Sequence, residues 1–303
     1  MKSTFRLYMW LIGFALIAAC SSTKQLSSGM TVAKNDTFDY TISQDTDMKI
    51  SIMGQDMSTS GKQVTDYAFT IKEVMPNGDF KSDVTIKRVA FNQKAPMVGE
   101  MVYDSADPEK NSNPMLKSLG ETVGKTFILS YDKQGKITKT EGVDKIVGDL
   151  AKGLDGQAGQ QIVTQMGAAG ITNTLKNLSG ILQDNPKVGG SWQVKSINRG
   201  FVDMDMDQTF TLRERKDGRA IIDVTGTAKS ISGDEGLSFH GMEIGYDLEG
   251  PISGTVIVEE ATGWAISSNI VPDLKGKMTL KGGPLGEMSV DASVKMGISA
   301  TRK

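Results

Sequence analysis

Apolar and polar residues alternate along most of the chain, a pattern typical of strands that place one face on a core and the other toward water. The longest run extends from Met288 to Thr301, where every second residue is apolar. These fourteen residues predict one strand of roughly 45 Å at about 3.4 Å per residue. Shorter runs of the same kind lie at Phe38–Ile42, Met48–Ile52, Tyr67–Ile71, Val84–Ile86, Phe127–Tyr131, Phe210–Leu212, Ile222–Val224 and Met242–Leu248.

Turn-forming residues separate these runs. Glycine for positive φ, proline and short polar residues occur together at Pro76–Asp79, Asp132–Gly135, Lys216–Gly218 and Gly282–Pro284. A repeated order of strand, tight turn and strand predicts antiparallel meanders. We therefore expect a mainly β (α+β) fold, with long antiparallel strands that form curved sheets or a half-barrel.

The middle of the chain has a helical period instead. Apolar residues fall on one helical stripe, first at Ile146, Leu150 and Leu154, and again at Ile171, Leu175, Leu178 and Leu182. We expect a helical insert at about 143–184. The insert is rich in glycine, and each glycine inside a helix costs about 1 kcal/mol relative to alanine. This stretch should therefore be the least stable part of the domain.

The insert lies between two segments with similar patterns. The stretch that starts at Thr65 aligns with the one that starts at Met206, so that Phe69 matches Phe210. We expect a single β-rich domain over 36–303, with two similar halves at 36–142 and 186–303 if the chain arose by duplication. Convergence of two hairpins on common turn chemistry explains the similarity equally well.

The first nineteen residues have the order of an export signal. Lys2 and Arg6 come first, then an apolar stretch, then the small pair Ala18-Ala19. The apolar run from Leu7 to Ala19 has 13 residues, whereas a transmembrane helix needs about 20. We therefore expect residues 1–19 to be a signal peptide that is removed.

The segment Ile17-Ala18-Ala19-Cys20 resembles the lipobox of bacterial lipoproteins. The resemblance implies cleavage between Ala19 and Cys20 and an acylated Cys20 that anchors the chain to a membrane. The polar Ser21 after the cysteine resembles the signal for sorting to the outer membrane, with the protein facing the periplasm. The alternative is an ordinary secretory signal followed by a chance cysteine. Residues 20–35 have no apolar period and predict a tether.

Charge and cysteine content narrow the function classes. Without Lys2 and Arg6 the chain has 32 basic and 36 acidic residues, so no strong positive field attracts nucleic acid. Cys20 is the only cysteine, so its acylation would leave no thiol for a disulfide. The domain must then rely on its apolar core.

The residues needed for catalysis are sparse. His240 is the only histidine, and no sequence motif of a hydrolase, zinc site or phosphate-binding loop occurs. Asp203, Asp205 and Asp207 share a strand face, and Asp104–Glu109 forms an acidic loop, but a solvated face and an ordinary turn explain them. We expect no catalysis, no cofactor and no metal site. A carboxylate hydrolase is the last of the alternative function classes that we retain.

Methionine is the unusual apolar component. The chain has 17 methionines, and this flexible side chain adapts to irregular partners. A concave sheet lined with such residues could hold an acyl chain, another lipid or an apolar peptide. Ordinary core filling gives the same pattern. The candidate ligand-facing residues are Met48, Ile50, Ile52, Met288, Val290, Val294 and Met296.

The domain also resembles a family of uncharacterised bacterial secreted proteins and lipoproteins, a domain of unknown function. The resemblance implies no activity. It rests on Asp47–Met57, Tyr103-Asp104-Ser105, and Gly124-Lys125 followed by Asp132, Gly135-Lys136-Ile137 and Glu141-Gly142. The expected architecture is similar to half-barrel carriers of lipoprotein acyl chains. We expect an envelope lipoprotein that binds a hydrophobic ligand. Its rival is a structural lipoprotein that docks an envelope protein without a ligand cavity; a membrane β-barrel is disfavoured.

Overall fold

A computed structural model describes most of the chain after residue 29. The described residues are 30–52, 55–95, 99–107, 109, 117–152, 168–182, 186–198, 202–231, 237–239, 242–283 and 286–303. Every described strand and both hydrophobic cores lie beyond residue 30. A chain that starts at Ser21 therefore retains all of these elements.

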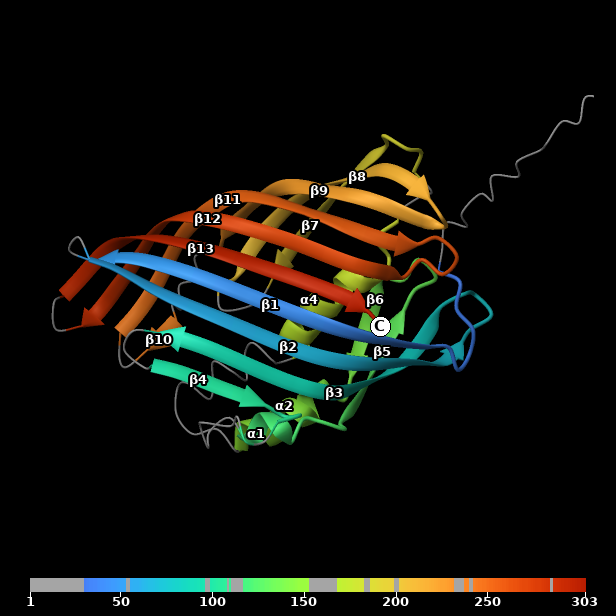
Figure 1. The fold of residues 1–303 in the computed structure, drawn as a ribbon, viewed down its shortest axis with the longest axis horizontal. Coiled ribbons are helices and arrows are strands. Elements are labelled where there is room, and N and C mark those ends of the chain that lie inside the picture. Colours follow the sequence, from blue (N-terminus) through green and yellow to red (C-terminus); the bar gives the residue numbers. More distant parts are fainter. Residues whose placement is uncertain are drawn as a thin grey trace, which may run out of the picture.

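The described strands form one antiparallel sheet of thirteen strands (Figure 1). Their order across the sheet is β6-β5-β3-β2-β1-β13-β12-β11-β9-β8-β7, with β4 beside β3 and β10 beside β11. The mainly β prediction is confirmed. The bounds are β1 Thr37–Ile52, β2 Gln55–Val74, β3 Phe80–Ala95, β4 Gly99–Asp104, β5 Thr126–Tyr131, β6 Ile137–Glu141, β7 Ser191–Asn198, β8 Met204–Lys216, β9 Arg219–Ser230, β10 Leu237–Phe239, β11 Met242–Glu259, β12 Ala265–Gly283 and β13 Gly286–Arg302.

The first strand pairs with the last. Strands β1 and β13 run antiparallel from the pair Tyr40 and Arg302 to the pair Ser51 and Asp291. This seam joins the strands before the helical insert to those after it, so each half of the chain forms one continuous block of the sheet. The similarity of the two halves stays a prediction.

Tight turns occur where glycine predicts them. Gly78 has a φ of 91° between β2 and β3, and Gly135 has a φ of 86° between β5 and β6. Strands β8 and β9 are joined by Asp217 and Gly218, whose φ values are 52° and 71°. Two successive positive φ values match the twist of an antiparallel pair, which is why Asp-Gly favours such hairpins.

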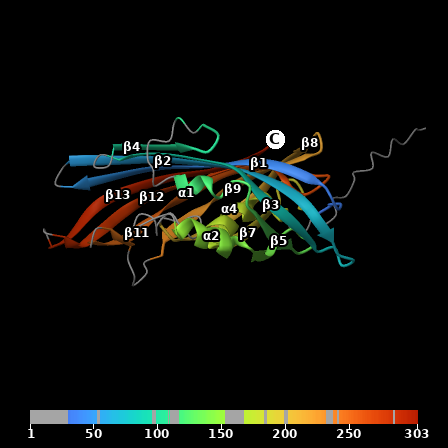
Figure 2. The same ribbon diagram turned by 90° about the horizontal axis from the view of Figure 1, so that it is seen from below.

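The sheet is arched, and the helices lie on its concave side (Figure 2). Some inward-facing positions are glycines at which a side chain would collide with the neighbouring strand. A Cβ on Gly250 would meet the carbonyl oxygen of Asp273, and one on Gly276 would meet that of Asp247. Gly226 and Gly254 have the same close approach to a neighbouring backbone. Such glycines let backbones approach where a sheet bends.

Replacing Gly250 with alanine should therefore destabilise the domain. The new Cβ would overlap a backbone atom, and overpacking of this kind costs about 1–3 kcal/mol. Urea denaturation measures the loss. The matched control is Gly245→Ala on the same strand, where the nearest heavy atom is the Cβ of Thr279 at 3.9 Å, and it should change stability by less than about 0.5 kcal/mol. Equal stability of the two variants would contradict this role of Gly250.

The predicted helical insert is present in its described parts. It contains α2 (Val143–Lys152), α4 (Ala168–Leu175) and the 3-10 helix η3 (Lys176–Leu178), while a separate short helix, α1 (Lys117–Gly120), precedes β5. The predicted stripe is correct up to Leu178, which is buried with Ile171 and Leu175. It is wrong at Leu182, because the chain turns extended at Ser179 and takes a positive φ at Gly180. Leu154 lies outside the described residues.

The α4–η3 segment bridges the two outer strands of the sheet. The hydroxyl of Thr172 is 3.0 Å from that of Thr140 on β6, and Lys176 Nζ donates to the carbonyl oxygen of Ile197 on β7 at 3.2 Å. Between them, Gln44 on β1 donates to the Thr174 hydroxyl at 3.0 Å. The sheet stays open as a β structure, and this helical segment spans the opening between its edges.

Two hydrophobic cores lie on the concave face. The first packs β1, β2, β3 and β5 against α2, α4 and η3 around an aromatic group centred on Trp264. The second lies among β8, β9, β11, β12 and β13. The second core continues into side chains that are only partly buried, and these form the candidate site.

Candidate functional site

Partly buried apolar side chains extend the second core along the concave face. We call these residues the methionine face: Met48, Ile50, Ile244, Tyr246, Leu280, Met288 and Met296. They come from β1, β13, β12 and β11, which are successive neighbours in the sheet (Figure 1). The register places them in adjacent rows, since Ile244 pairs with Leu280 and Leu280 pairs with Met288. The face therefore offers one continuous apolar surface.

Most of the predicted ligand-facing residues lie together on this concave face. Met48, Ile50, Met288 and Met296 are partly buried. Val290 and Val294 lie between Met288 and Met296 on β13 and are 6% and 1% exposed. They therefore belong to the core beneath the methionine face. Met48 pairs directly with Val294 across the β1–β13 seam. The side chain of Ile52 lies outside the described part of the chain. That these residues face a ligand stays a prediction.

Tyr246 supplies the one hydroxyl of the methionine face. Burial raises the pKa of Tyr246 above its ordinary value, so the hydroxyl is neutral at any physiological pH and can donate or accept a hydrogen bond. The methionines around it are polarizable and adopt many rotamers, which suits contact with ligands of varied shape. The methionine face therefore offers apolar contacts and one neutral hydroxyl.

A small cavity lies beside α4, nearer the first core. It is bounded by β1, β2 and α4, and its volume is about 30 Å³. Its lining includes the polar side chains of Gln44, Gln63, Thr65 and Thr174. A volume of this size suits one water molecule, whereas ligand sites begin at about 300 Å³. This cavity is too small for an acyl chain.

Three buried polar groups on the concave face were not anticipated from the sequence. The side-chain nitrogens Trp192 Nε1, on β7, Gln208 Nε2, on β8, and Trp264 Nε1, in the first core, have no hydrogen-bond partner among the described residues. The signal that could have found Gln208 is its place in the alternation, because it is the one polar residue among Met204, Met206, Phe210 and Leu212.

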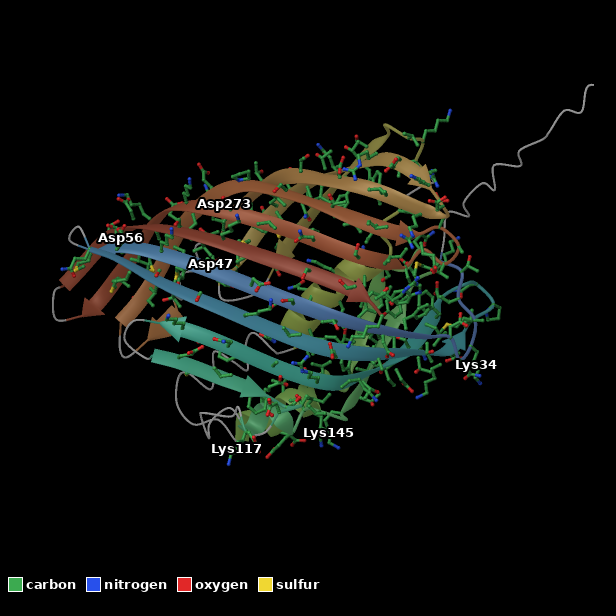
Figure 3. All side chains as sticks on the ribbon, in the orientation of Figure 1. Lys34, Asp47, Asp56, Lys117, Lys145 and Asp273 are labelled. Atoms are coloured by element: carbon green, nitrogen blue, oxygen red, sulfur yellow. The ribbon has the colours of Figure 1, made fainter. Side chains whose placement is uncertain are left out.

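The convex face is polar and carries paired charges. Figure 3 labels Asp47 on β1 and Asp273 on β12, both on this face. Asp207, one of the three aspartates of the predicted acidic strand, lies 3.3 Å from Lys195. In the acidic loop, Asp104 accepts hydrogen bonds from Arg88 at 2.9 and 2.6 Å. These carboxylates are engaged in ion pairs within the sheet.

Several predicted features lie outside the described residues. They are the signal peptide with Ala19, the lipidation residue Cys20 and His240. Within the described ranges, no helix has the length and apolar character needed to cross a membrane. No group of three or more His, Cys, Asp or Glu side chains in those same ranges could hold a metal ion.

Comparison with known proteins gives a family but no activity. The sequence profile of a family of unknown function (DUF6263) matches residues 77–265, which is more than half of the chain. This agrees with the resemblance of the strand and turn residues to an uncharacterised family. No curated protein matches the sequence.

Similarities to solved structures are distant. Lipovitellin, from a study of its lipid–protein interactions, is 10% identical with a TM-score of 0.49 over 90% of this chain, which spans about a quarter (25%) of lipovitellin. An outer membrane channel from Pseudomonas putida F1 is 6% identical with a TM-score of 0.26, over 90% of this chain and 97% of the channel. DynF of Micromonospora chersina, from the dynemicin biosynthesis pathway, is 7% identical with a TM-score of 0.20, over 89% and 82% of the two chains. Any function must be argued from the site itself.

Proposed function

We propose a function from the geometry of the site, because the chain belongs to the DUF6263 family, whose function is unknown. The protein is a non-catalytic lipoprotein of the cell envelope that holds a hydrophobic ligand on the concave face of its sheet. The ligand class is a lipid, an acyl chain or an apolar peptide. A lipid anchor on Cys20 attaches the protein to the outer membrane, on the periplasmic side.

The methionine face is the observation that carries this proposal. Seven large side chains from four strands are only partly buried on a concave surface. A molecule bound there would remove apolar area from water, with a gain of about 25 cal/mol per Å². The arrangement supports a binding surface, while the polar convex face offers ion pairs and hydroxyls to solvent.

The envelope location rests on the first twenty residues. Their charge, apolar and small-residue order is typical of an export signal, and the lipobox resemblance adds the acyl chains. Two or more acyl chains hold a protein on a membrane stably, at about 0.8 kcal/mol per buried methylene. A tethered domain would then meet lipids and partner proteins close to the membrane surface.

Native mass spectrometry of the chain from Ser21 onward tests whether the protein carries a bound ligand. The protein is purified from a Gram-negative host without detergent, and its mass is compared with that of the denatured chain. We expect an added mass of one lipid-sized molecule that organic extraction removes. A mass equal to that of the chain alone, with no uptake of added fatty acid or phospholipid, would contradict the proposal.

Docking of an envelope protein without a ligand is the second candidate. The observation that favours it is the small volume of the cavity beside α4, about 30 Å³, because that cavity cannot hold a lipid and binding would fall to the surface of the described sheet. In that case the methionine face would be covered by a protein partner. A single stoichiometric protein recovered with the chain, in place of a lipid, would favour this second function.

A further inference from the structure

Two hydrogen-bond donors next to the second core, on the concave face, have no partner within the described part of the chain. They are the indole N–H of Trp192 and the side-chain amide of Gln208. Gln208 is only 3% exposed. Proteins form hydrogen bonds with nearly all of their buried polar groups. Two unpaired donors on one face therefore indicate that a bound molecule supplies the missing acceptor.

The register brings these two donors close together. Trp192 pairs with Phe210, and Val194 pairs with Gln208, so the donors are diagonal neighbours on one face of β7 and β8. Diagonal neighbours are about 7–8 Å apart, a separation that side chains of this length can bridge. The indole is held in place by its stack on Phe210, with ring centroids 5.8 Å apart and an interplanar angle of 17°.

The residue paired with Gln208 on the neighbouring strand is a glycine. Gly226 on β9 pairs with Gln208, so no side chain from that position covers the amide. A Cβ on Gly226 would also collide with the Asp207 carbonyl oxygen and approach the backbone of Gln208. The backbones of β8 and β9 therefore lie unusually close beside Gln208. The amide nitrogen is buried, so a ligand that bonds to it must enter the core and displace the side chains that cover it.

The acceptor for such donors should be uncharged. The buried polar side chains among the described residues are Thr65, Ser82, Thr122, Ser179, Gln208, Ser230 and Ser268, and none carries a charge. A buried carboxylate with no cation beside it would be expensive, whereas a neutral carbonyl oxygen accepts one or two N–H bonds. We propose that Trp192 and Gln208 bind the carbonyl oxygen of an ester or amide attached to an apolar chain. This inference rests on the proposed function and narrows its ligand class to neutral acyl lipids.

One row of residues connects the donors to the methionine face. Across the sheet, Gln208 pairs with Gly226, which pairs with Ile252 on β11. Ile252 pairs with Pro272 on β12, and the neighbouring strand there is β13, which carries Met296. Four strand spacings of about 4.8 Å make about 19 Å along the sheet, the length scale of a long acyl chain. Ile252 is 2% exposed, so an acyl chain along this row would lie within the second core. One acyl ester that enters the core there would place its carbonyl at the donors and its chain on the methionines.

Competition between an ester and a hydrocarbon tests the inference. The chain from Ser21 onward binds the fluorescent apolar probe N-phenylnaphthylamine, which is then displaced by methyl oleate or by octadecene. We expect methyl oleate to compete about fivefold more strongly, the effect of one or two neutral hydrogen bonds. In Gln208→Leu and in Trp192→Phe this advantage should fall below about twofold, while the affinity for the probe is kept.

The variants separate a ligand contact from a structural role. Trp192→Phe keeps the aromatic stack and removes only the N–H, so it guards against misfolding of Gln208→Leu. Gln193→Leu, on the opposite face of β7, is the matched control and should keep the ester preference. Equal competition by the two compounds in the unaltered protein, or a preference that persists in both donor variants, would overturn the inference, and the donors would then hold no more than water. Failure of the probe itself to bind would overturn the proposed function as well.

Discussion

Replacing Trp264 with alanine is expected to lower the free energy of unfolding by about 3–5 kcal/mol, the range for removal of a buried aromatic from a core. Trp264 is 0% exposed, and its ring lies 5.0 Å from Phe38 and 5.8 Å from Phe69 between ring centroids. Tyr131 meets it edge-on at 5.9 Å. Phe38, Phe69 and Tyr131 come from β1, β2 and β5, and Trp264 directly precedes β12, so one side chain holds together strands on both sides of the seam.

Guanidinium denaturation of the chain from Ser21 onward measures this loss. Trp264→Phe is the matched control, because it keeps an aromatic ring and removes an indole N–H that has no hydrogen-bond partner. We expect it to lose clearly less stability than Trp264→Ala. A Trp264→Ala protein within about 1 kcal/mol of the unaltered one, the average effect of an ordinary substitution, would mean that this aromatic group is not the centre of the first core.

Replacing Cys20 with alanine is expected to abolish acylation of the protein. An acyl chain contributes about 0.8 kcal/mol per buried methylene to membrane attachment, so its loss is the largest effect on location that one residue can produce. Metabolic labelling with an alkyne-tagged palmitate in a Gram-negative host measures the acylation of the protein directly. The unaltered chain should be labelled, and Cys20→Ala should not.

Ser21→Ala serves as the control for the labelling experiment. It changes the residue next to the modification site and leaves the thiol, so it should be labelled as strongly as the unaltered chain. An unlabelled natural chain would show that the segment before Cys20 is an ordinary signal and that the anchor is absent. Equal labelling of Cys20→Ala would show that Cys20 is not the acylated residue.

Local patterns predicted the strands and turns well. The alternation from Met288 to Thr301 lies within β13, and the Asp217-Gly218 pair forms the two-residue link between β8 and β9. The reason is that side-chain alternation and positive φ are decided within a few residues. The helical stripe was predicted too far, to Leu182, because periodicity does not show that Ser179 and Gly180 end the helical segment.

Long-range pairing was beyond the reach of these patterns. The residues of β1 and β13 do not by themselves indicate that the first strand lies beside the last. This pairing depends on how the whole sheet packs its apolar face. The inward glycines, such as Gly250 and Gly276, resemble weak strand positions in the sequence. Their role is visible only when the carbonyl oxygens of Asp273 and Asp247 are in place beside them.

The candidate site was predicted in part. The alternation placed Met48 and Met296 on one face, and the structure puts their strands side by side. Ile244, Tyr246 and Leu280 were missed as members, because their strands join this surface through pairings that span many residues. A filled core and a binding surface produce the same alternation, so the partial exposure of these side chains could come only from the structure.

The affinity of the chain from Ser21 onward for N-phenylnaphthylamine tests the central claim most directly. We compare Met48→Gln combined with Met296→Gln, on the concave face, with Lys49→Gln combined with Lys295→Gln, on the convex face of the same two strands. If the methionine face binds apolar molecules, the methionine variant should bind the probe about tenfold or more weakly, because each buried methionine contributes about 1.5–3 kcal/mol, and the lysine variant should bind it normally. Equal affinities in the two variants, or no binding by the unaltered chain, would contradict a hydrophobic binding function for this face.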